Sequence, residues 1–175
     1  QPVLLHVEPE PCSGTWSMAT DEYLLEAAIT DHLKAVRLYR WEEATISLGY
    51  FQDANDESLS TAFRDLPVVR RLSGGGAILH DRELTYSFVL PADDPLATEP
   101  TELYGHVHLA IIEVLRSHHV NCAMRGEART LDDEPFLCFV RGDRHDILCA
   151  GHKIVGSAQR RRKGAVLQHG SILLE

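Results

Sequence analysis

The segment Arg70-Arg71-Leu72-Ser73-Gly74-Gly75-Gly76-Ala77-Ile78-Leu79-His80-Asp81 combines two cations, three consecutive glycines and a short apolar run. A glycine triplet lets backbone N–H groups approach a ligand at a distance that a Cβ atom would prevent. Two adjacent guanidinium groups suit a carboxylate or a phosphate. A flexible hairpin turn with solvated arginines is the alternative, and this segment alone does not decide between a binding loop and a turn.

Other unusual segments surround this one. Near the start stand Trp16-Ser17-Met18-Ala19-Thr20-Asp21-Glu22 and Ser47-Leu48-Gly49-Tyr50-Phe51-Gln52. Later come Gly151-His152-Lys153-Ile154-Val155-Gly156-Ser157-Ala158-Gln159 and Leu167-Gln168-His169-Gly170-Ser171. In this order the segments resemble the lipoate and octanoate attachment family. That family comprises lipoate–protein ligases and octanoyltransferases and shares a fold with biotin ligases, and the likeness runs from about residue 14 to the last residue.

Length and composition are typical of a globular enzyme. The 175 residues suffice for one domain with a substantial core, and 44% of them are hydrophobic. A formal charge of −9 disfavours a nucleic-acid partner. Neither a membrane span nor a signal peptide is visible, so we expect a cytoplasmic protein without a membrane partner. Because members of the family continue past this end, residues 1–175 are expected to be a single biotin/lipoate ligase-type catalytic domain that lacks a C-terminal portion.

The cysteines and histidines do not predict a metal site. Cys12, Cys122, Cys138 and Cys149 lack Cys-x-x-Cys spacing, so we expect free thiols in a reducing compartment. On a helix, His106 and His108 would face different directions.

Hydrophobic periodicity predicts an α+β fold. Helices are expected over 17–30 and 102–118, and the short connections between strands favour antiparallel neighbours. Turns are expected at Gly151-His152 and at Arg162-Lys163-Gly164. The resemblance implies a central mixed, largely antiparallel sheet flanked by helices, as in class II tRNA synthetase and biotin ligase catalytic domains. The predicted strands are 3–7, 35–41, 45–49, 67–72, 83–90, 120–124, 136–140, 146–150, 153–159 and 165–174.

A cysteine and a lysine are the candidate catalytic pair. Cys138 precedes Lys153 by 15 residues (153 − 138), so a strand, a turn and a second strand could bring the two together. A neighbouring ammonium stabilises a thiolate, which is the nucleophilic form. The arrangement resembles the cysteine-dependent octanoyltransferases of the LipM type. Without that resemblance, Cys138 between Leu137 and Phe139 would be interpreted as a core residue, and Lys153 as a solvated turn lysine.

The resemblance also implies an acyl and head-group site around the glycine loop and the lysine motif. Ile78, Leu79 and Val155 are candidate walls of an acyl tunnel. His80 and His169 could each be a general base, or each could have a hydrogen-bonded structural role. The candidate binding residues are Arg71, Ser73, Gly74, Gly75, Gly76, Ala77, Ile78, Leu79, His80, Gly156, Ser157 and Ala158.

The function that the resemblance implies is protein lipoylation. An octanoyl group would pass from octanoyl-acyl carrier protein, through a cysteine thioester, to the target lysine of a lipoyl domain. The acceptor would be a 2-oxo acid dehydrogenase lipoyl domain or the glycine cleavage H protein, and no cofactor would be needed. One alternative is an ATP-dependent lipoate–protein ligase, which uses lipoate, ATP and Mg and proceeds through lipoyl-AMP. Another is an inactive relative that binds acyl groups or lipoyl domains.

A basic cluster, Arg160-Arg161-Arg162-Lys163, contrasts with the acidic chain. A solvated hairpin turn explains it simply. As a docking point for an acidic partner, it would mainly raise the rate of encounter.

Overall fold

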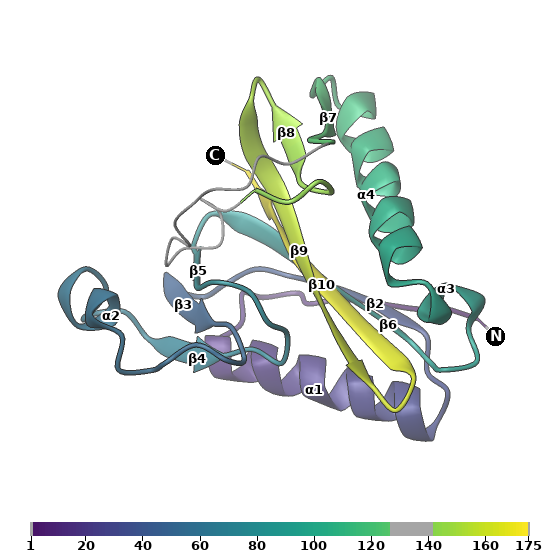
Figure 1. The fold of residues 1–175 in the computed structure, drawn as a ribbon, viewed down its shortest axis with the longest axis horizontal. Helices are drawn as coiled ribbons and strands as arrows, with labels where there is room; N and C mark the ends of the chain where they lie inside the picture. The colour runs from purple at the N-terminus through teal and green to yellow at the C-terminus, as the bar shows by residue number, and fades with distance from the viewer. Residues whose placement is uncertain (1, 127–141, 175) are drawn as a thin grey trace.

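The computed structural model describes residues 2–126 and 142–174, which form two sheets and their covering helices (Figure 1). The larger sheet has seven strands, and of its strand pairs only β1–β2 is parallel. The expected mixed, largely antiparallel sheet is therefore confirmed. In spatial order its strands are β1 (Leu4–Val7), β2 (Ala35–Tyr39), β6 (Glu83–Leu90), β10 (Ala165–Leu173), β9 (His152–Arg162), β8 (Ile147–Cys149) and β7 (Cys122–Met124).

A second, three-stranded sheet carries the glycine loop. Its order is β4 (Val68–Arg70), β3 (Thr45–Leu48) and β5 (Ile78–His80), with β3 parallel to β4 and antiparallel to β5. The residues between β4 and β5 form the loop, so both of its ends are anchored on β3.

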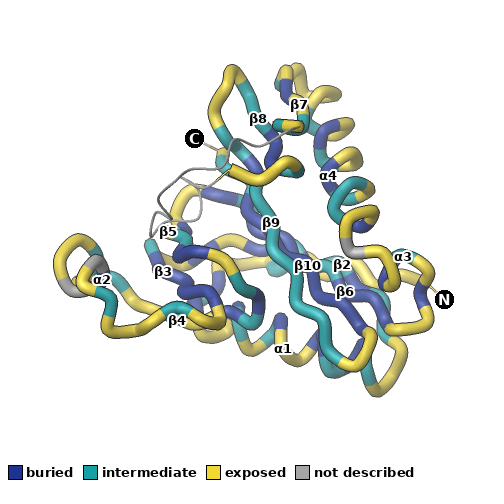
Figure 2. The backbone as a smooth tube through the Cα atoms, in the orientation of Figure 1, coloured by how far each residue is buried: buried dark blue, intermediate teal, exposed yellow. Residues whose placement is uncertain are grey.

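Two long helices cover opposite faces of the larger sheet (Figure 1). Because side chains alternate along a strand, neighbouring residues of β10 face opposite ways. Leu167 packs in a cluster with Leu25 of α1 (Gly14–Thr30), whereas Val166 packs with Leu103 of α4 (Pro100–Ser117). Full burial of a side chain such as Leu25 contributes roughly 1.5–3 kcal/mol. Strands β6 and β10, which lie between the two helices, are accordingly buried over most of their length (Figure 2).

The predicted helices are confirmed, and each begins slightly earlier than expected. Ser13 caps α1, its hydroxyl accepting from the Trp16 N–H at 3.3 Å, so that helix begins at Gly14 and not at Ser17. Helix α4 starts at Pro100, where a proline's missing N–H costs nothing.

Both predicted hairpins are present, although the first turn lies one residue earlier than the expected Gly151-His152 because His152 already belongs to β9. Ala150-Gly151 joins β8 to β9 and Lys163-Gly164 joins β9 to β10, with positive φ at all four residues. This backbone matches the right-handed twist of the flanking strands.

Three short elements were not expected: α2 (Glu57–Thr61), α3 (Pro95–Thr98) and β5. Strand β5 exists because Ile78 and His80 pair with β3, far away in sequence, and a run this short leaves no periodic signal. The strand expected over 136–140 lies outside the described residues. None of the described helices has the length and apolar character needed to cross a membrane.

Candidate functional site

A pocket lies between the two sheets, next to the glycine loop. The space between its walls, with the open mouth included, amounts to about 490 Å³. Apolar and aromatic side chains from α1, β2, β5 and the segment that follows β2 give it a largely apolar wall. Its lining residues are Met18, Tyr39, Trp41, Ser47, Arg71, Ile78, His80, Thr85, Lys153, Gly156, Ser157, Ala158, His169, Gly170 and Ser171.

Arg71 holds the glycine loop in shape. Its side chain is buried, and Nη2 donates to the carbonyl oxygens of Gly74 at 2.8 Å and Gly76 at 2.7 Å. Nη1 donates to the carbonyl oxygen of Ser47 at 2.9 Å, which ties the loop to β3. The guanidinium lines the pocket, but these donors are directed at protein carbonyl groups. Arg71 therefore determines the loop's conformation as well as the charge beside the cavity.

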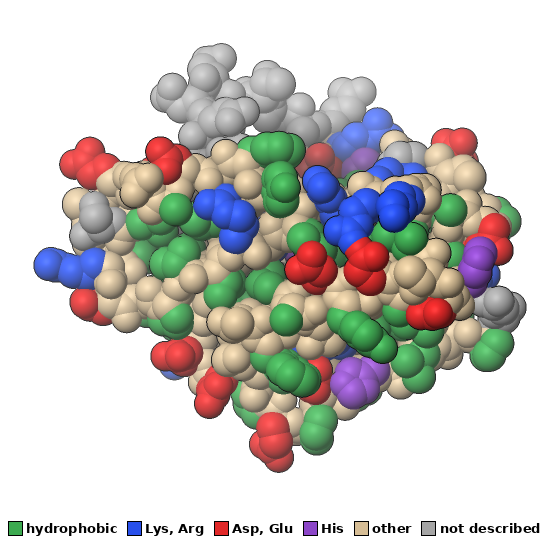
Figure 3. Space-filling model, turned by 90° about the horizontal axis from the view of Figure 1, so that it is seen from below, with side chains coloured by type: hydrophobic (Ala, Val, Ile, Leu, Met, Phe, Trp, Pro, Cys, Tyr) green, Lys and Arg blue, Asp and Glu red, His purple; other side chains and the backbone are tan. Residues whose placement is uncertain are grey.

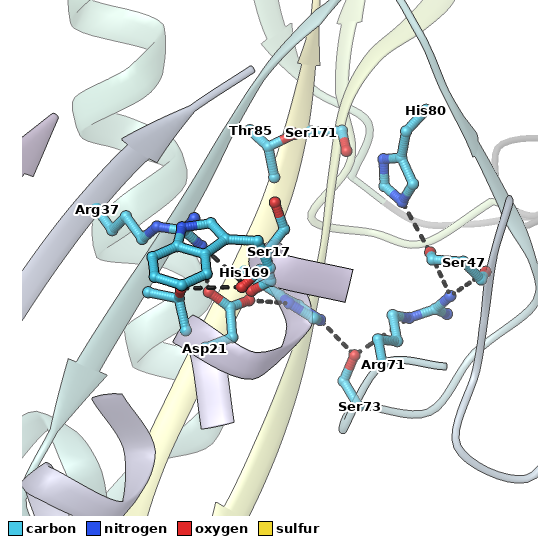
Figure 4. Close-up of polar contacts among 12 residues, drawn as sticks. Ser17, Asp21, Arg37, Ser47, Arg71, Ser73, His80, Thr85, His169 and Ser171 are labelled. Atoms are coloured by element: carbon cyan, nitrogen blue, oxygen red, sulfur yellow. Dashed lines mark hydrogen bonds and ion pairs between the residues drawn. The ribbon is translucent and has the colours of Figure 1, made fainter. Parts of the chain in front are cut away.

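A first serine–histidine–carboxylate chain runs from Arg71 along the pocket (Figure 4). The Ser47 hydroxyl accepts from Arg71 Nη1 at 3.2 Å and lies 2.7 Å from His80 Nε2. On the other side of the ring, His80 Nδ1 lies 2.7 Å from Glu83 Oε1. Burial lowers the pKa of His80, although the Glu83 carboxylate opposes this shift. His80 is thus a neutral ring that donates to Glu83 and accepts from Ser47.

Glu83 is fixed by several donors. Its Oε1 accepts from Thr85 at 2.6 Å and from Ser171 at 2.7 Å, in addition to His80. Burial would raise the pKa of this carboxyl, but these hydrogen bonds outweigh it and the pKa is lowered. Trp41 completes the wall, since its indole stacks on His80 with ring centroids 3.9 Å apart and donates to Thr85.

A second chain of the same kind reaches Arg71 from α1. Arg71 Nε donates to the Ser73 hydroxyl at 3.2 Å, and that hydroxyl lies 2.5 Å from His169 Nε2. His169 Nδ1 lies 3.0 Å from Asp21 Oδ2, whose other oxygen pairs with Arg37 at 3.2 Å. Figure 4 shows this chain joining α1, β10 and the glycine loop. His80 and His169 therefore both have hydrogen-bonded roles that link the two sheets.

Lys153 lies where this pocket meets a larger, more polar cavity, and it lines both. Its Nζ is 2.9 Å from Asp146 Oδ1, and both side chains are buried, at 8% and 3% exposure. Gly156 makes room for this arrangement, because a Cβ there would lie 2.6 Å from Lys153 Cε. The larger cavity is lined by Gly74, Gly75, Thr101, Tyr104, Gly142, Asp143, His145, Asp146, Lys153, Ser157, Ala158 and Gln159.

The predicted site residues divide between the two cavities. Those lining the first pocket are Arg71, Ile78, His80, Lys153, Gly156, Ser157 and Ala158, and Gly74 and Gly75 line the second. Ser73, Gly76 and Ala77 are buried within the loop. Leu79 is 41% exposed, and Val155 packs beneath α4, so neither lines the pocket described above. Cys138 lies outside the described residues.

The basic cluster is divided among different surfaces because successive strand residues point opposite ways. The Arg160 guanidinium lies over the Tyr50 ring, 4.8 Å from its centroid, and Arg161 donates to the carbonyl oxygen of Ala97. Arg162 pairs with Glu26 of α1, and Lys163 occupies the hairpin turn. On the face seen in Figure 3, basic and acidic side chains likewise lie next to one another. Docking of a partner at residues 160–163 stays a prediction.

Several residues that form the described site were missed by sequence reasoning. Asp146 is seven positions before Lys153 and is brought to it by the β8–β9 hairpin, whereas Trp41 and Thr85 meet only through strand pairing. Asp21 had one detectable signal, since it lies in the early motif Trp16–Glu22 as an acid on the buried face of a helix.

The chain matches known proteins over most of its length. A family model described as the lipoyl protein ligase A/B catalytic domain matches residues 13–175. Octanoyltransferase LipM of Brevibacillus brevis is 36% identical over 182 aligned residues, covering 97% of this chain and 65% of that protein. The chain thus spans just under two thirds of that relative's length.

Solved structures show the same fold. Lipoate-protein ligase A bound with ATP superposes with a TM-score of 0.78 at 26% identity, covering 100% of this chain and 68% of the ligase. A bi-partite lipoate protein ligase from Thermoplasma acidophilum, studied with its E2 lipoyl domain, gives a TM-score of 0.71 at 26% identity, covering 99% and 61%. The expected biotin/lipoate ligase fold is confirmed. The chain belongs to the lipoyl protein ligase A/B catalytic domain family.

Proposed function

We propose that this protein is an octanoyltransferase of protein lipoylation. It takes an octanoyl group from octanoyl-acyl carrier protein and transfers it to the target lysine of a lipoyl domain, in a 2-oxo acid dehydrogenase or the glycine cleavage H protein. The observation that carries the proposal is the position of Lys153, a buried ammonium where an apolar pocket meets a polar cavity. The likeness to octanoyltransferase LipM supports the choice of reaction. A cytoplasmic location is part of the same proposal.

The proposed reaction has two transfers through Cys138. The Cys138 thiolate attacks the donor's thioester carbonyl, and the carrier thiol leaves as the octanoyl–sulfur bond forms on the enzyme. The acceptor lysine then attacks this thioester, an amide forms, and the Cys138 thiolate is regenerated. Lys153 favours the thiolate electrostatically. Each step keeps an activated acyl group until the amide forms, so neither ATP nor another cofactor is consumed.

Mass spectrometry tests the covalent step. After mixing with octanoyl-acyl carrier protein, the protein should gain the mass of one octanoyl group, and peptide mapping should place it on Cys138. Cys138→Ala should remove both the adduct and the transfer to a lipoyl domain. Cys149→Ala is the matched control, since it deletes a half-buried free thiol in β8 and should leave the adduct in place. Full transfer activity of Cys138→Ala would overturn the proposal.

An ATP-dependent lipoate–protein ligase is the second candidate function. The structural likeness to lipoate-protein ligase A bound with ATP favours it, as does a polar cavity large enough for a nucleotide beside Lys153. In this reaction lipoate and ATP, with Mg, would yield lipoyl-AMP and pyrophosphate. Release of pyrophosphate on addition of lipoate and ATP, with no adduct on Cys138, would identify the ligase.

A further inference from the structure

A third serine–histidine pair lies on the α4 side of the larger sheet. The Ser157 hydroxyl on β9 contacts His108 Nε2 on α4, and it lies 2.6 Å from the Tyr86 hydroxyl on β6. Ser157 lines both cavities next to Lys153, whereas His108 is only 1% exposed. The pair therefore connects a buried imidazole to the place where the two cavities meet.

The lack of a side chain at Gly170 allows this contact. Tyr86, Gly170 and Ser157 lie directly opposite one another on three adjacent strands. A Cβ atom at Gly170 would lie 2.8 Å from the Tyr86 hydroxyl, so the tyrosine reaches Ser157 only by crossing over a glycine. The motif that contains Gly170 thereby shapes the hydroxyl pair on β6 and β9.

Hydrogen bonding fixes which nitrogen of His108 can accept a proton. Nδ1 lies 2.5 Å from the carbonyl oxygen of His145, which is only an acceptor, so Nδ1 carries the hydrogen. Nε2 is then the free base, and the Ser157 hydroxyl donates to it while accepting from Tyr86. Burial lowers the pKa of His108, so the ring is neutral near pH 7. The Nε2 lone pair of His108 therefore accepts from the Ser157 hydroxyl, and Ser157 lines the cavity.

The charges around His108 come from several elements. The loop before β8 supplies Asp143, His145 and Asp146. The two carboxylates raise the pKa of His108 and so oppose the effect of burial, which lowers it. Tyr104, on the same helix, places its ring edge-on to His108 with centroids 6.2 Å apart, and Tyr86 faces Ser157 from the sheet. The pKa of Tyr86 is raised to about 12 by burial, so it stays a neutral donor.

The other candidates for a proton acceptor are less suitable. Ser47 and Ser73 each accept a hydrogen bond from Arg71, and a positive charge there disfavours the arrival of a proton. Lys153 pairs with Asp146 as an ammonium, and an ammonium has no lone pair to offer. Ser157 receives its described hydrogen bond from a neutral tyrosine, so a proton can pass through it to His108 without a guanidinium beside the hydroxyl.

We propose that Ser157 and His108 take the proton that the acceptor lysine loses when it attacks the acyl group. This step rests on the proposed function. As the N–C bond forms and the C–S bond breaks, the amine proton passes to Ser157 Oγ and the serine proton passes to His108 Nε2. The sulfur leaves as a thiolate, and the imidazolium returns its proton to water. Ser157 contacts the reacting amine, whereas His108 is a positioning residue that acts through it.

Separate measurement of the two half-reactions tests this assignment. Once the octanoyl adduct has formed, Ser157→Ala and His108→Gln should each transfer it to a lipoyl domain about 100-fold more slowly than the wild type in a single turnover, in line with the loss of a general base. His106→Gln on the same helix, which is exposed, is the matched control and should transfer normally. If wild-type protein forms no adduct, the proposed function fails. If the adduct forms and His108→Gln transfers it at the wild-type rate, only the present inference fails.

The pH profile of transfer distinguishes a chemical role from a structural one. Protonation of the acceptor amine lowers transfer at acid pH in both proteins, so the informative quantity is the ratio of the wild-type rate to the His108→Gln rate. This ratio should be large near neutral pH and should fall towards one at acid pH, where His108 of the wild type is itself protonated. Ser157→Thr keeps a hydroxyl and should transfer the acyl group faster than Ser157→Ala. If the alanine variant fails to fold, the transfer rate of the threonine variant is compared with that of the wild type. A rate ratio that does not change between neutral and acid pH, or equal rates for the threonine and alanine variants, would overturn the assignment.

Discussion

Asp146 and Lys153 form a buried ion pair that closes the β8–β9 hairpin over the junction of the two cavities. Asp146 Oδ1 lies 2.9 Å from Lys153 Nζ, while Oδ2 accepts from the Asp143 backbone N–H at 2.8 Å. The carboxylate thus holds the ammonium and the preceding loop at the same time. The ion pair therefore fixes the position of the Lys153 ammonium at the end of its flexible side chain.

Asp146→Asn should destabilise the protein by about 3–5 kcal/mol, because it leaves a buried ammonium without its carboxylate. Urea unfolding measures the loss. Asp143→Asn is the matched control, since that carboxyl is 67% exposed. The double variant Asp146→Asn, Lys153→Met should lose less unfolding free energy than the sum of the losses in the two single variants. The difference should be at least about 1 kcal/mol. Strict additivity would contradict a direct pairing of these two side chains.

Arg71→Lys should loosen the glycine loop. An ammonium supplies three donors at one point and cannot reach Ser47, Ser73, Gly74 and Gly76 together, so buried carbonyl groups lose partners at about 1–3 kcal/mol each. The expected result is faster amide hydrogen exchange in the loop and a clear loss of stability.

Arg70→Lys provides the comparison for that change. Arg70 is exposed and binds three carbonyl groups through the single atom Nη1, which an ammonium can imitate. Equal effects of the two substitutions would show that the buried fork of Arg71 is not what orders the loop.

Gly170→Ala should lower the unfolding free energy by about 1–3 kcal/mol, because its Cβ would meet Gly156 O at 2.6 Å and the Tyr86 ring at 2.8 Å. Gly105→Ala, in the middle of α4, has no described atom within 4 Å and should instead raise stability by about 0.5–1 kcal/mol. Thermal denaturation of the two variants decides the matter. A gain in stability for Gly170→Ala would mean that Tyr86 does not cross that glycine.

Stability should fall as the pH drops below about 6.5. Burial lowers the pKa of His80 and of His108, so the unfolded chain takes up these protons before the folded protein does. The slope is at most about 1.4 kcal/mol per pH unit for each histidine. His80→Gln should reduce the slope between pH 7 and 5, and exposed His106→Gln should keep it. A stability that is flat across this range would contradict the buried, neutral state of both rings.

Most of the fold could be predicted from the sequence because its long elements have strong periodicity. Strand β6 has the expected bounds, and β10 differs at one end by a single residue. Strand β5 and helix α2 were missed because elements this short depend on tertiary contacts and not on local pattern. The hairpin turns were predictable because glycine tolerates their positive φ.

The candidate site was predictable only where its residues form contiguous motifs. Lys153 and the glycine loop were found in that way, and they lie against the cavities. Asp146 and His108 were not, since a lone acid or histidine carries no signal until folding brings it to a partner. Arg71 was found as a cation beside glycines, yet its contacts with carbonyl groups depend on the loop's path in space.

The first pocket has walls from two separate sheets. Ser47 and Ile78 belong to the three-stranded sheet, whereas Thr85 and Ser171 belong to the seven-stranded sheet. Neither sheet encloses the apolar space by itself, so the space comes into existence only when the two dock. An apolar ligand that fills this space would oppose the separation of the two sheets, so its binding alone should stabilise the protein against unfolding.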